Sequence, residues 1–137
     1  MSNASAIIDK MYNNDPFSKW LGIERIEEKP GEVVLQLTVR AEMLNGFDIA
    51  HGGITYSLAD SALAFSANGH GIQSVSIETS ISHTKPVKEG DVLRTHVVEE
   101  SLTSKIGIYS ISILNQHQEK VALFKGTVYR TGKSWEV

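Results

Sequence analysis

The alternation of apolar and polar residues predicts a strand early in the chain. In EVVLQLTV, residues 32–39, every second side chain is apolar: Val33, Leu35, Leu37 and Val39. Successive side chains of a strand point to opposite faces of a sheet, so this period of two is typical of a half-buried strand. The preceding stretch IERIEEK is separated from it by Pro30-Gly31, a pair that favours a turn. We therefore expect these two stretches to pair as neighbouring strands.

A different pattern, in GGITYSLADSALAFSAN, predicts a helix over about residues 52–67. Its apolar or small residues point in nearly every direction, which is typical of a helix buried on all sides. The residues that cover most directions are Ile54, Leu58, Ala59, Ala62, Leu63 and Phe65. Burial of such side chains, at about 1.5–3 kcal/mol for each large one, makes this helix a main contributor to stability. Asn68-Gly69 predicts a left-handed cap at its end.

Four further stretches predict strands, at residues 73–87, 91–100, 105–116 and 120–130. We expect the turns between them at residues 88–90, near 101–103 and at 116–119. These connections are too short for the crossovers that parallel strands need. The pattern therefore predicts an α+β fold in which an antiparallel six-stranded sheet wraps around the long central helix. Two short helices precede it, one over residues 5–12 and one that Asp15-Pro16 caps and Gly22 ends.

The composition indicates a single domain over residues 1–137, without internal repeats, low-complexity tracts or linkers. Its 13 basic and 16 acidic residues give a formal charge of −3. This charge disfavours nucleic acid as a partner, because it supplies no strong positive field. No segment approaches the roughly 20 apolar residues that span a bilayer, and the N-terminal residues do not form a secretory signal. We expect a cytoplasmic protein with no membrane partner.

The residue types also limit the chemistry. The chain has no cysteine, which excludes thiolate nucleophiles and cysteine-based zinc sites. His70, His83, His96 and His117 are scattered, without a close ligand pair such as His-x-x-x-His. The serines of SLADS lack the G-x-S-x-G motif of a serine hydrolase. We expect no metal and no other cofactor, so oxygen and nitrogen groups must carry the reaction.

Asp60 places a carboxylate in the middle of the apolar helix. An interior aspartate has poor helix propensity, and a buried carboxylate must be hydrogen-bonded, paired or neutralised. Because ionisable groups in apolar settings are enriched at functional sites, the position favours a role in chemistry. The alternative is a structural carboxylate that bridges two subunits or caps a neighbouring element.

His51-Gly52-Gly53 opens the same helix. The first N–H groups of a helix have no intrahelical acceptor, and glycines let another molecule approach the backbone. This describes an oxyanion hole, although two glycines also relieve crowding where a loop enters a buried helix. Gly52 and Asp60 are eight residues apart, or about 12 Å along one helix. If they act together, they must come from two subunits, which predicts an obligate dimer with two composite sites.

The chain also carries Asn45 before HGG, then SLADSALAFSANG, KPVKEGD and NQHQEKVALFKGTVYR. In these motifs, over roughly residues 17–130, it resembles the PaaI-type acyl-CoA thioesterases of the hotdog fold. The resemblance implies a hotdog domain, dimers that usually pair into homotetramers, and hydrolysis of small aryl- or acyl-CoA thioesters without a metal.

The resemblance further implies roles for individual residues. Asp60 acts as general base on water or as nucleophile, and Gly52 gives its backbone N–H to the thioester oxygen. Asn45 orients the thioester or the water, and His51 lines the same hole. Ser76, on the next strand, is the best match for a hydroxyl that positions the water.

Contacts with the substrate are expected at several other positions. Gly53 leaves room beside the helix start, and Tyr56 and Leu63 shape the acyl pocket. Lys85 and Lys88 are candidates for the phosphates of CoA, although a solvated charged face explains single lysines equally well. Aryl-acetyl, benzoyl and medium-chain acyl groups all stay open, because one methylene changes selectivity by only about 1–3 kcal/mol.

Two other functions stay open. Hotdog relatives also dehydrate hydroxyacyl thioesters, typically with a histidine beside the carboxylate, but the spacing of His51 from Asp60 fits the thioesterase pattern better. A non-catalytic acyl-CoA or aromatic-ligand binding module needs an attached output segment, for which we expect little room outside residues 16–130. Retained ligand affinity without turnover distinguishes the binding module from the enzyme.

Overall fold

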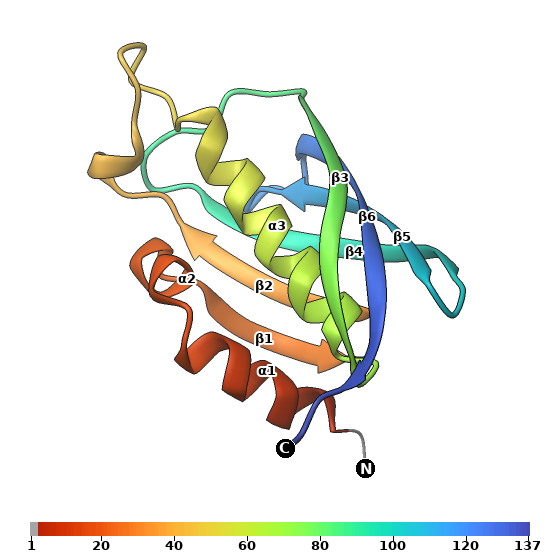
Figure 1. The fold of residues 1–137 in the computed structure, drawn as a ribbon. Coiled ribbons are helices and arrows are strands. Elements are labelled where there is room, and N and C mark those ends of the chain that lie inside the picture. Colours follow the sequence, from red (N-terminus) through yellow and green to blue (C-terminus); the bar gives the residue numbers. More distant parts are fainter. Residues whose placement is uncertain (1–2) are drawn as a thin grey trace.

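The computed structural model describes residues 3–137, which form one six-stranded sheet with a long helix across it (Figure 1). The strands are β1 (Glu24–Lys29), β2 (Glu32–Thr38), β3 (Ile72–His83), β4 (Val92–Leu102), β5 (Ile106–Leu114) and β6 (Lys120–Ser134). They lie in the order β1-β2-β4-β5-β6-β3, and every neighbouring pair is antiparallel. The predicted α+β architecture is confirmed, and β1 pairs with β2 as expected from IERIEEK and EVVLQLTV.

The long helix, α3 (Gly52–Asn68), packs against β2, β3, β4, β5 and β6. Leu58, Ala59 and Ala62 are fully buried against the sheet. They belong to the same core as the alternating apolar residues of β2. This explains the alternation in EVVLQLTV, because Val33, Leu35 and the apolar residue at each second position after them face this helix. Figure 1 shows α3 lying across the sheet with β3 and β6 at one edge and β1 and β2 at the other.

One face of α3 is less covered than the sequence predicts. Gly53, Ser57, Asp60, Ser61 and Ala64 are all partly or fully exposed in the single chain. They follow the spacing of one helix face, and we call them the exposed α3 face. The apolar pattern predicts burial on all sides, yet small and polar residues here leave one side of the helix open.

Two short helices precede the sheet: α1 (Ala4–Asn13) and α2 (Pro16–Leu21). Asp15 caps α2, because its side chain accepts from the Ser18 N–H, and Gly22 ends the helix with φ of 74°. Both features match the prediction. Both helices pack against α3, and α1 also contacts β1. A short 3-10 turn, η1 (Ala41–Met43), begins the loop that leads to α3.

The end of α3 corrects the predicted left-handed cap at Asn68-Gly69. Gly69 has φ of −59° and its N–H bonds to the Phe65 carbonyl at 2.9 Å, so the helical path continues through it. The left-handed residue is Gly71, with φ of 100°. A Cβ on Gly69 would lie 3.1 Å from the Phe65 oxygen. Glycine at position 69 avoids this tight contact, and the handedness changes two residues later.

Within residues 3–137, no helix is long and apolar enough to cross a membrane.

Candidate functional site

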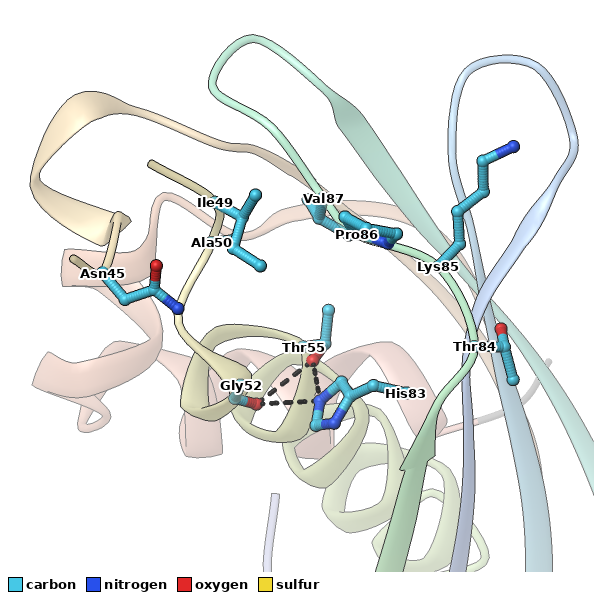
Figure 2. A pocket seen from close by; sticks show the side chains of 10 residues that line it. All are labelled: Asn45, Ile49, Ala50, Gly52, Thr55, His83, Thr84, Lys85, Pro86 and Val87. Carbon is cyan, nitrogen blue, oxygen red and sulfur yellow. Dashed lines mark hydrogen bonds between the residues drawn. The ribbon is translucent and has the colours of Figure 1, made fainter. Parts of the chain in front are cut away.

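A cavity of about 400 Å³ lies at the N-terminal end of α3 (Figure 2). It is bounded by the loop before α3, the first turn of α3, and the end of β3 with the segment that follows. The lining residues are Asn45, Ile49, Ala50, Gly52, Thr55, His83, Thr84, Lys85, Pro86 and Val87. We call it the helix-start pocket. Three predicted site residues, Asn45, Gly52 and Lys85, therefore come together here.

Backbone hydrogen bonds hold the walls of the helix-start pocket in place. The Asn45 N–H donates to the Ile49 carbonyl at 2.8 Å, and the Asn45 side chain accepts from the Phe47 N–H at 2.8 Å. The Ala50 N–H donates to the Val87 carbonyl at 2.6 Å, which ties the loop before α3 to the segment after β3. Asn45 therefore lies in a closed turn whose position relative to Gly52 is fixed.

The predicted oxyanion group lies at the start of α3. Gly52 is the first helical residue, so its N–H has no intrahelical acceptor, and within residues 3–137 it has no other acceptor. A Cβ on Gly53 would meet nothing within 4 Å. His51 precedes the helix with an exposed side chain that makes no capping hydrogen bond. The backbone at Gly52 and Gly53 is thus free to receive a ligand oxygen.

His83 also belongs to this pocket, and sequence reasoning missed it. Its Nε2 lies 2.8 Å from Thr55 Oγ1 and 3.3 Å from the Gly52 carbonyl oxygen, as Figure 2 shows. A Cβ on Gly52 would lie 3.1 Å from the His83 ring. Glycine at position 52 therefore makes room for a ring of the same chain. One feature of the sequence could have identified His83. The connection after α3 is short, so β3 must run back along the helix and end beside Gly52.

Asp60 lines a second, smaller cavity of about 290 Å³, beside the middle of α3. Its lining residues are Met11, Asp60, Leu63, Ala64, Asn68, Ser74, Val75, Ser76 and Val128. We call it the Asp60 pocket. Ser76 pairs with the buried Val128 in the sheet, which places it on the side that faces the helix. Three further predicted residues, Asp60, Leu63 and Ser76, thus share one cavity.

The Asp60 carboxylate is half-buried, and within residues 3–137 it has no hydrogen-bond donor and no ion-pair partner. Burial raises the pKa of Asp60 above its usual range, because an ion loses hydration in apolar surroundings. The nearby negative charge of Asp15 raises the pKa further. A carboxylate in this setting is a stronger base than one in water.

Three predicted substrate contacts, Gly53, Tyr56 and Lys88, line neither pocket. The Tyr56 hydroxyl bonds to Thr79 Oγ1, and its ring packs edge-on against Phe124 with the centroids 5.5 Å apart. Lys88 is exposed in the turn before β4. Lys85 forms an ion pair with Glu119 at the rim of the helix-start pocket. Residues 3–137 contain no group of three or more His, Asp or Glu side chains placed to hold a metal ion.

Residues 47–122 match the family described as the thioesterase superfamily. The acyl-coenzyme A thioesterase PaaI of Escherichia coli is 40% identical over 122 residues, which cover 89% of this chain and 87% of that protein. The structure of E. coli PaaI, from the phenylacetic acid degradation operon, superposes with a TM-score of 0.93 at 38% identity, and 96% of each chain is covered.

A protein of Streptococcus pneumoniae TIGR4 described as a hypothetical thioesterase, solved with coenzyme A, is 26% identical with a TM-score of 0.78, covering 82% of this chain and 91% of that one. Mutant structures of that protein change to alanine an aspartate and a threonine that are sixteen residues apart. Taken together, the family match and the E. coli relative show that this chain belongs to the thioesterase superfamily, as a PaaI-type acyl-CoA thioesterase with the hotdog fold.

Proposed function

We propose that the protein hydrolyses small aryl- or acyl-CoA thioesters to the free acid and CoA, at two composite sites shared by a pair of subunits. One observation carries the proposal: the unpartnered Asp60 carboxylate lies on the exposed α3 face, in a pocket separate from the helix-start pocket. Each subunit thus holds one half of the machinery. A second subunit, placed antiparallel, supplies the other half.

The surface of the chain supports this pairing. β3 is an edge strand of twelve residues, and its second edge has no neighbour among residues 3–137. Val75 and Ile77 on it are 57% and 58% exposed. A long edge strand with exposed apolar side chains is a template for pairing with another chain. Pairing of β3 with β3 of a second copy would bring the two exposed α3 faces together across a two-fold axis.

In the proposed reaction, the Gly52 N–H of one subunit donates to the thioester oxygen, and Asn45 orients the thioester. Asp60 of the partner subunit takes a proton from water, whose oxygen attacks the carbonyl carbon. Negative charge then develops on the oxygen that Gly52 faces, where a fixed donor lowers the barrier most. The C–S bond breaks, and the CoA sulfur receives the proton. In the nucleophilic variant of this scheme, the Asp60 carboxylate itself attacks the carbonyl carbon, the C–S bond breaks and CoA leaves as a thiolate that takes a proton; water then hydrolyses the resulting anhydride and frees the acid and Asp60.

Ser76 is proposed to position the attacking water. It lines the Asp60 pocket, and its hydroxyl has no hydrogen-bond partner within residues 3–137. Asp60 and Ser76 are separated by sixteen residues, the same separation as the aspartate and threonine mutated in the S. pneumoniae protein. A hydroxyl beside a carboxylate, both free of other bonds, can hold one water between them.

The substrate is proposed to enter by the helix-start pocket and to place its acyl group in the Asp60 pocket of the partner subunit. The Leu63, Val75 and Val128 side chains give that pocket apolar walls, and its volume of about 290 Å³ suits a small acyl or aryl group. Lys85, at the rim of the helix-start pocket, is proposed to meet a CoA phosphate. His51 keeps the role that the family resemblance implies, and Gly53, Tyr56 and Lys88 keep the substrate contacts expected from the sequence.

Two further parts of the proposal concern assembly and location. Leu123 and Tyr129 leave apolar surface on the outer face of the sheet, 43% and 41% exposed, and a dimer of dimers would cover it. Since acyl-CoA esters are made and used inside cells, the cytoplasm is the proposed location.

The test measures thiol release from a panel of acyl- and aryl-CoA esters with a thiol-reactive dye. The chain has no cysteine, so the protein adds no background. Asp60→Asn should lower turnover by about 10²–10⁴-fold and leave the oligomer intact, because a placed base contributes that much. Asp9→Asn, which removes an exposed carboxylate on α1, is the matched control and should keep full turnover. Binding of acyl-CoA without turnover by the wild type would instead identify a binding module.

A further inference from the structure

A second aspartate lies close to Asp60 and is held by an organised set of hydrogen bonds. Asp15 is the N-cap of α2, and its Oδ1 accepts from the Ser18 N–H at 2.9 Å. Its Oδ2 accepts from the Ser18 hydroxyl at 2.6 Å. Both carboxylate oxygens are therefore held in place by donors of Ser18.

The same serine joins α2 to the helix that carries Asp60. Ser18 is 1% exposed, and its Oγ lies 2.8 Å from the Oγ of Ser61. Since the Ser18 hydroxyl donates its only proton to Asp15, the Ser61 hydroxyl must donate to Ser18. Ser61 directly follows Asp60 on the exposed α3 face. The relay from Asp15 through Ser18 to Ser61 thus fixes the negative charge of Asp15 relative to the turn that bears Asp60.

No cation offsets this charge at Asp60 among the described residues. On α1, Lys10 bonds to the Glu136 carbonyl and Asp9 pairs with Arg25. On α2, Lys19 bonds to the Asn13 carbonyl. On β3, Glu78 pairs with Lys125. Burial raises the pKa of Asp60, and the charge of Asp15 raises it further.

We propose that Asp15 is a positioning residue for the thioesterase reaction: fixed on α2 by Ser18, it acts through its charge and keeps the Asp60 carboxylate ready to accept a proton. This inference rests on the proposed function of Asp60. The two carboxylates then differ by environment, one held by hydrogen bonds from Ser18, the other unpartnered and more basic. In this proposal α2 contributes to the reaction as well as to packing.

The test replaces Asp15 by asparagine, which caps a helix as well as aspartate does but carries no charge. The acidic limb of kcat against pH should move to lower pH by about half a unit to one unit. At neutral pH kcat should fall about two- to fivefold, because a weaker base accepts the proton less readily, and KM should stay within about twofold of the wild type. Asp15→Ser, another uncharged cap, gives a second variant in case the amide disturbs the fold.

A titration of the Asp60 carboxyl carbon by NMR, in wild type and Asp15→Asn, gives a readout that does not depend on turnover. The pKa of Asp60 should be lower in the variant, and Asp9→Asn should leave both the titration and the acidic limb unchanged. If the pKa of Asp60 does not change in Asp15→Asn, or changes equally in Asp9→Asn, the inference about Asp15 is overturned and the proposed function still stands. If the wild type turns over none of the esters, the proposed function is overturned, and the role of Asp15 in the reaction is overturned with it.

Discussion

Asp60 carries a carboxylate that no donor or cation of residues 3–137 stabilises, so ionising it opposes folding. Because the pKa of Asp60 is raised in the folded protein, the folded state binds more protons than the unfolded state between the two pKa values. The contribution of this group to stability is therefore complete at low pH and is lost as pH rises through that window. The residue proposed to carry the chemistry is one that weakens the fold at neutral pH.

Asp60→Asn should accordingly be more stable than the wild type at pH 7. The gain should be less than about 1 kcal/mol, because solvent screens a half-exposed group, and it should shrink below about pH 4, where the wild-type carboxyl is also protonated. Urea unfolding at the two pH values, at one fixed protein concentration, measures the difference. Equal midpoints at pH 7 would mean that a group of the partner subunit already stabilises the anion.

Individual residues show which parts of the candidate site the sequence can predict. Asp60 and Gly52 were identifiable because each breaks a local pattern, a charge in an apolar helix and a glycine pair at its start. His83 breaks no local pattern, and its partners Gly52 and Thr55 are 31 and 28 residues away. Tyr56 has the type of an acyl-pocket residue, but its hydroxyl is engaged by Thr79. Contacts between distant segments decide these cases.

The elements are joined at the far end of α3 by a partly buried polar cluster. The Tyr109 hydroxyl on β5 donates to Glu99 Oε2 on β4 at 2.7 Å, and His70 Nε2, just after α3, lies 2.5 Å from the same oxygen. Tyr109 is completely buried, and burial raises the pKa of its phenol so that it stays a donor. The Glu99 carboxylate therefore links β4, β5 and the segment that follows α3.

Tyr109→Phe should lower the free energy of unfolding by about 1–3 kcal/mol, since it removes a hydrogen bond to a charged group without changing the packing of the ring. Tyr129→Phe is the control, because Tyr129 is 41% exposed on β6 and its change should cost less than about 0.5 kcal/mol. Chemical denaturation of both variants gives the comparison. A Tyr109→Phe variant as stable as the control would show that water replaces the phenol at Glu99.

The order and type of the elements were predictable, but the end of α3 was not. Period-two alternation, the cap at Asp15-Pro16 and the short turns all act locally, so the sequence predicts them well. Asn68 instead uses its side chain across the fold: it donates to Ala64 and Ser74 and accepts from the Trp135 indole. A residue tied to both β3 and the segment after β6 does not follow local cap preferences. Tertiary contacts moved the change of handedness to Gly71.

The two edges of the sheet differ, and the difference indicates where the proposed second subunit would bind. β1 is six residues long and mostly charged, which protects that edge. β3 at the opposite edge is twice as long and exposes Val75 and Ile77. Together with the exposed α3 face, it leaves one side of the molecule open. The apolar pattern of α3, which predicts burial all round, is consistent with a helix whose last face would be covered only in the proposed dimer.

Ile77→Lys should therefore weaken the dimer, because it places a charge on the unpaired edge of β3. The dissociation constant should rise at least about tenfold, or about 1.4 kcal/mol, and turnover per subunit should fall with dilution. Ile26→Lys, at a 44% exposed position on the protected edge strand β1, should leave the dimer unchanged. Sedimentation over a range of concentrations distinguishes the two variants. If both behave as the wild type, the subunits pair through another surface.

A mixing experiment tests the shared site directly. Asn45→Ala and Asp60→Asn each disable a different half, because Asn45 lines the helix-start pocket and Asp60 lines its own. In a mixed dimer, one site receives both altered residues, and the other receives an intact Asn45 from one subunit and an intact Asp60 from the other. Random exchange of two inactive variants should thus restore about one quarter of the wild-type turnover, since half of the dimers are mixed and each has one working site. Sites built within one subunit would each keep one altered residue, so the mixture would stay as inactive as its components.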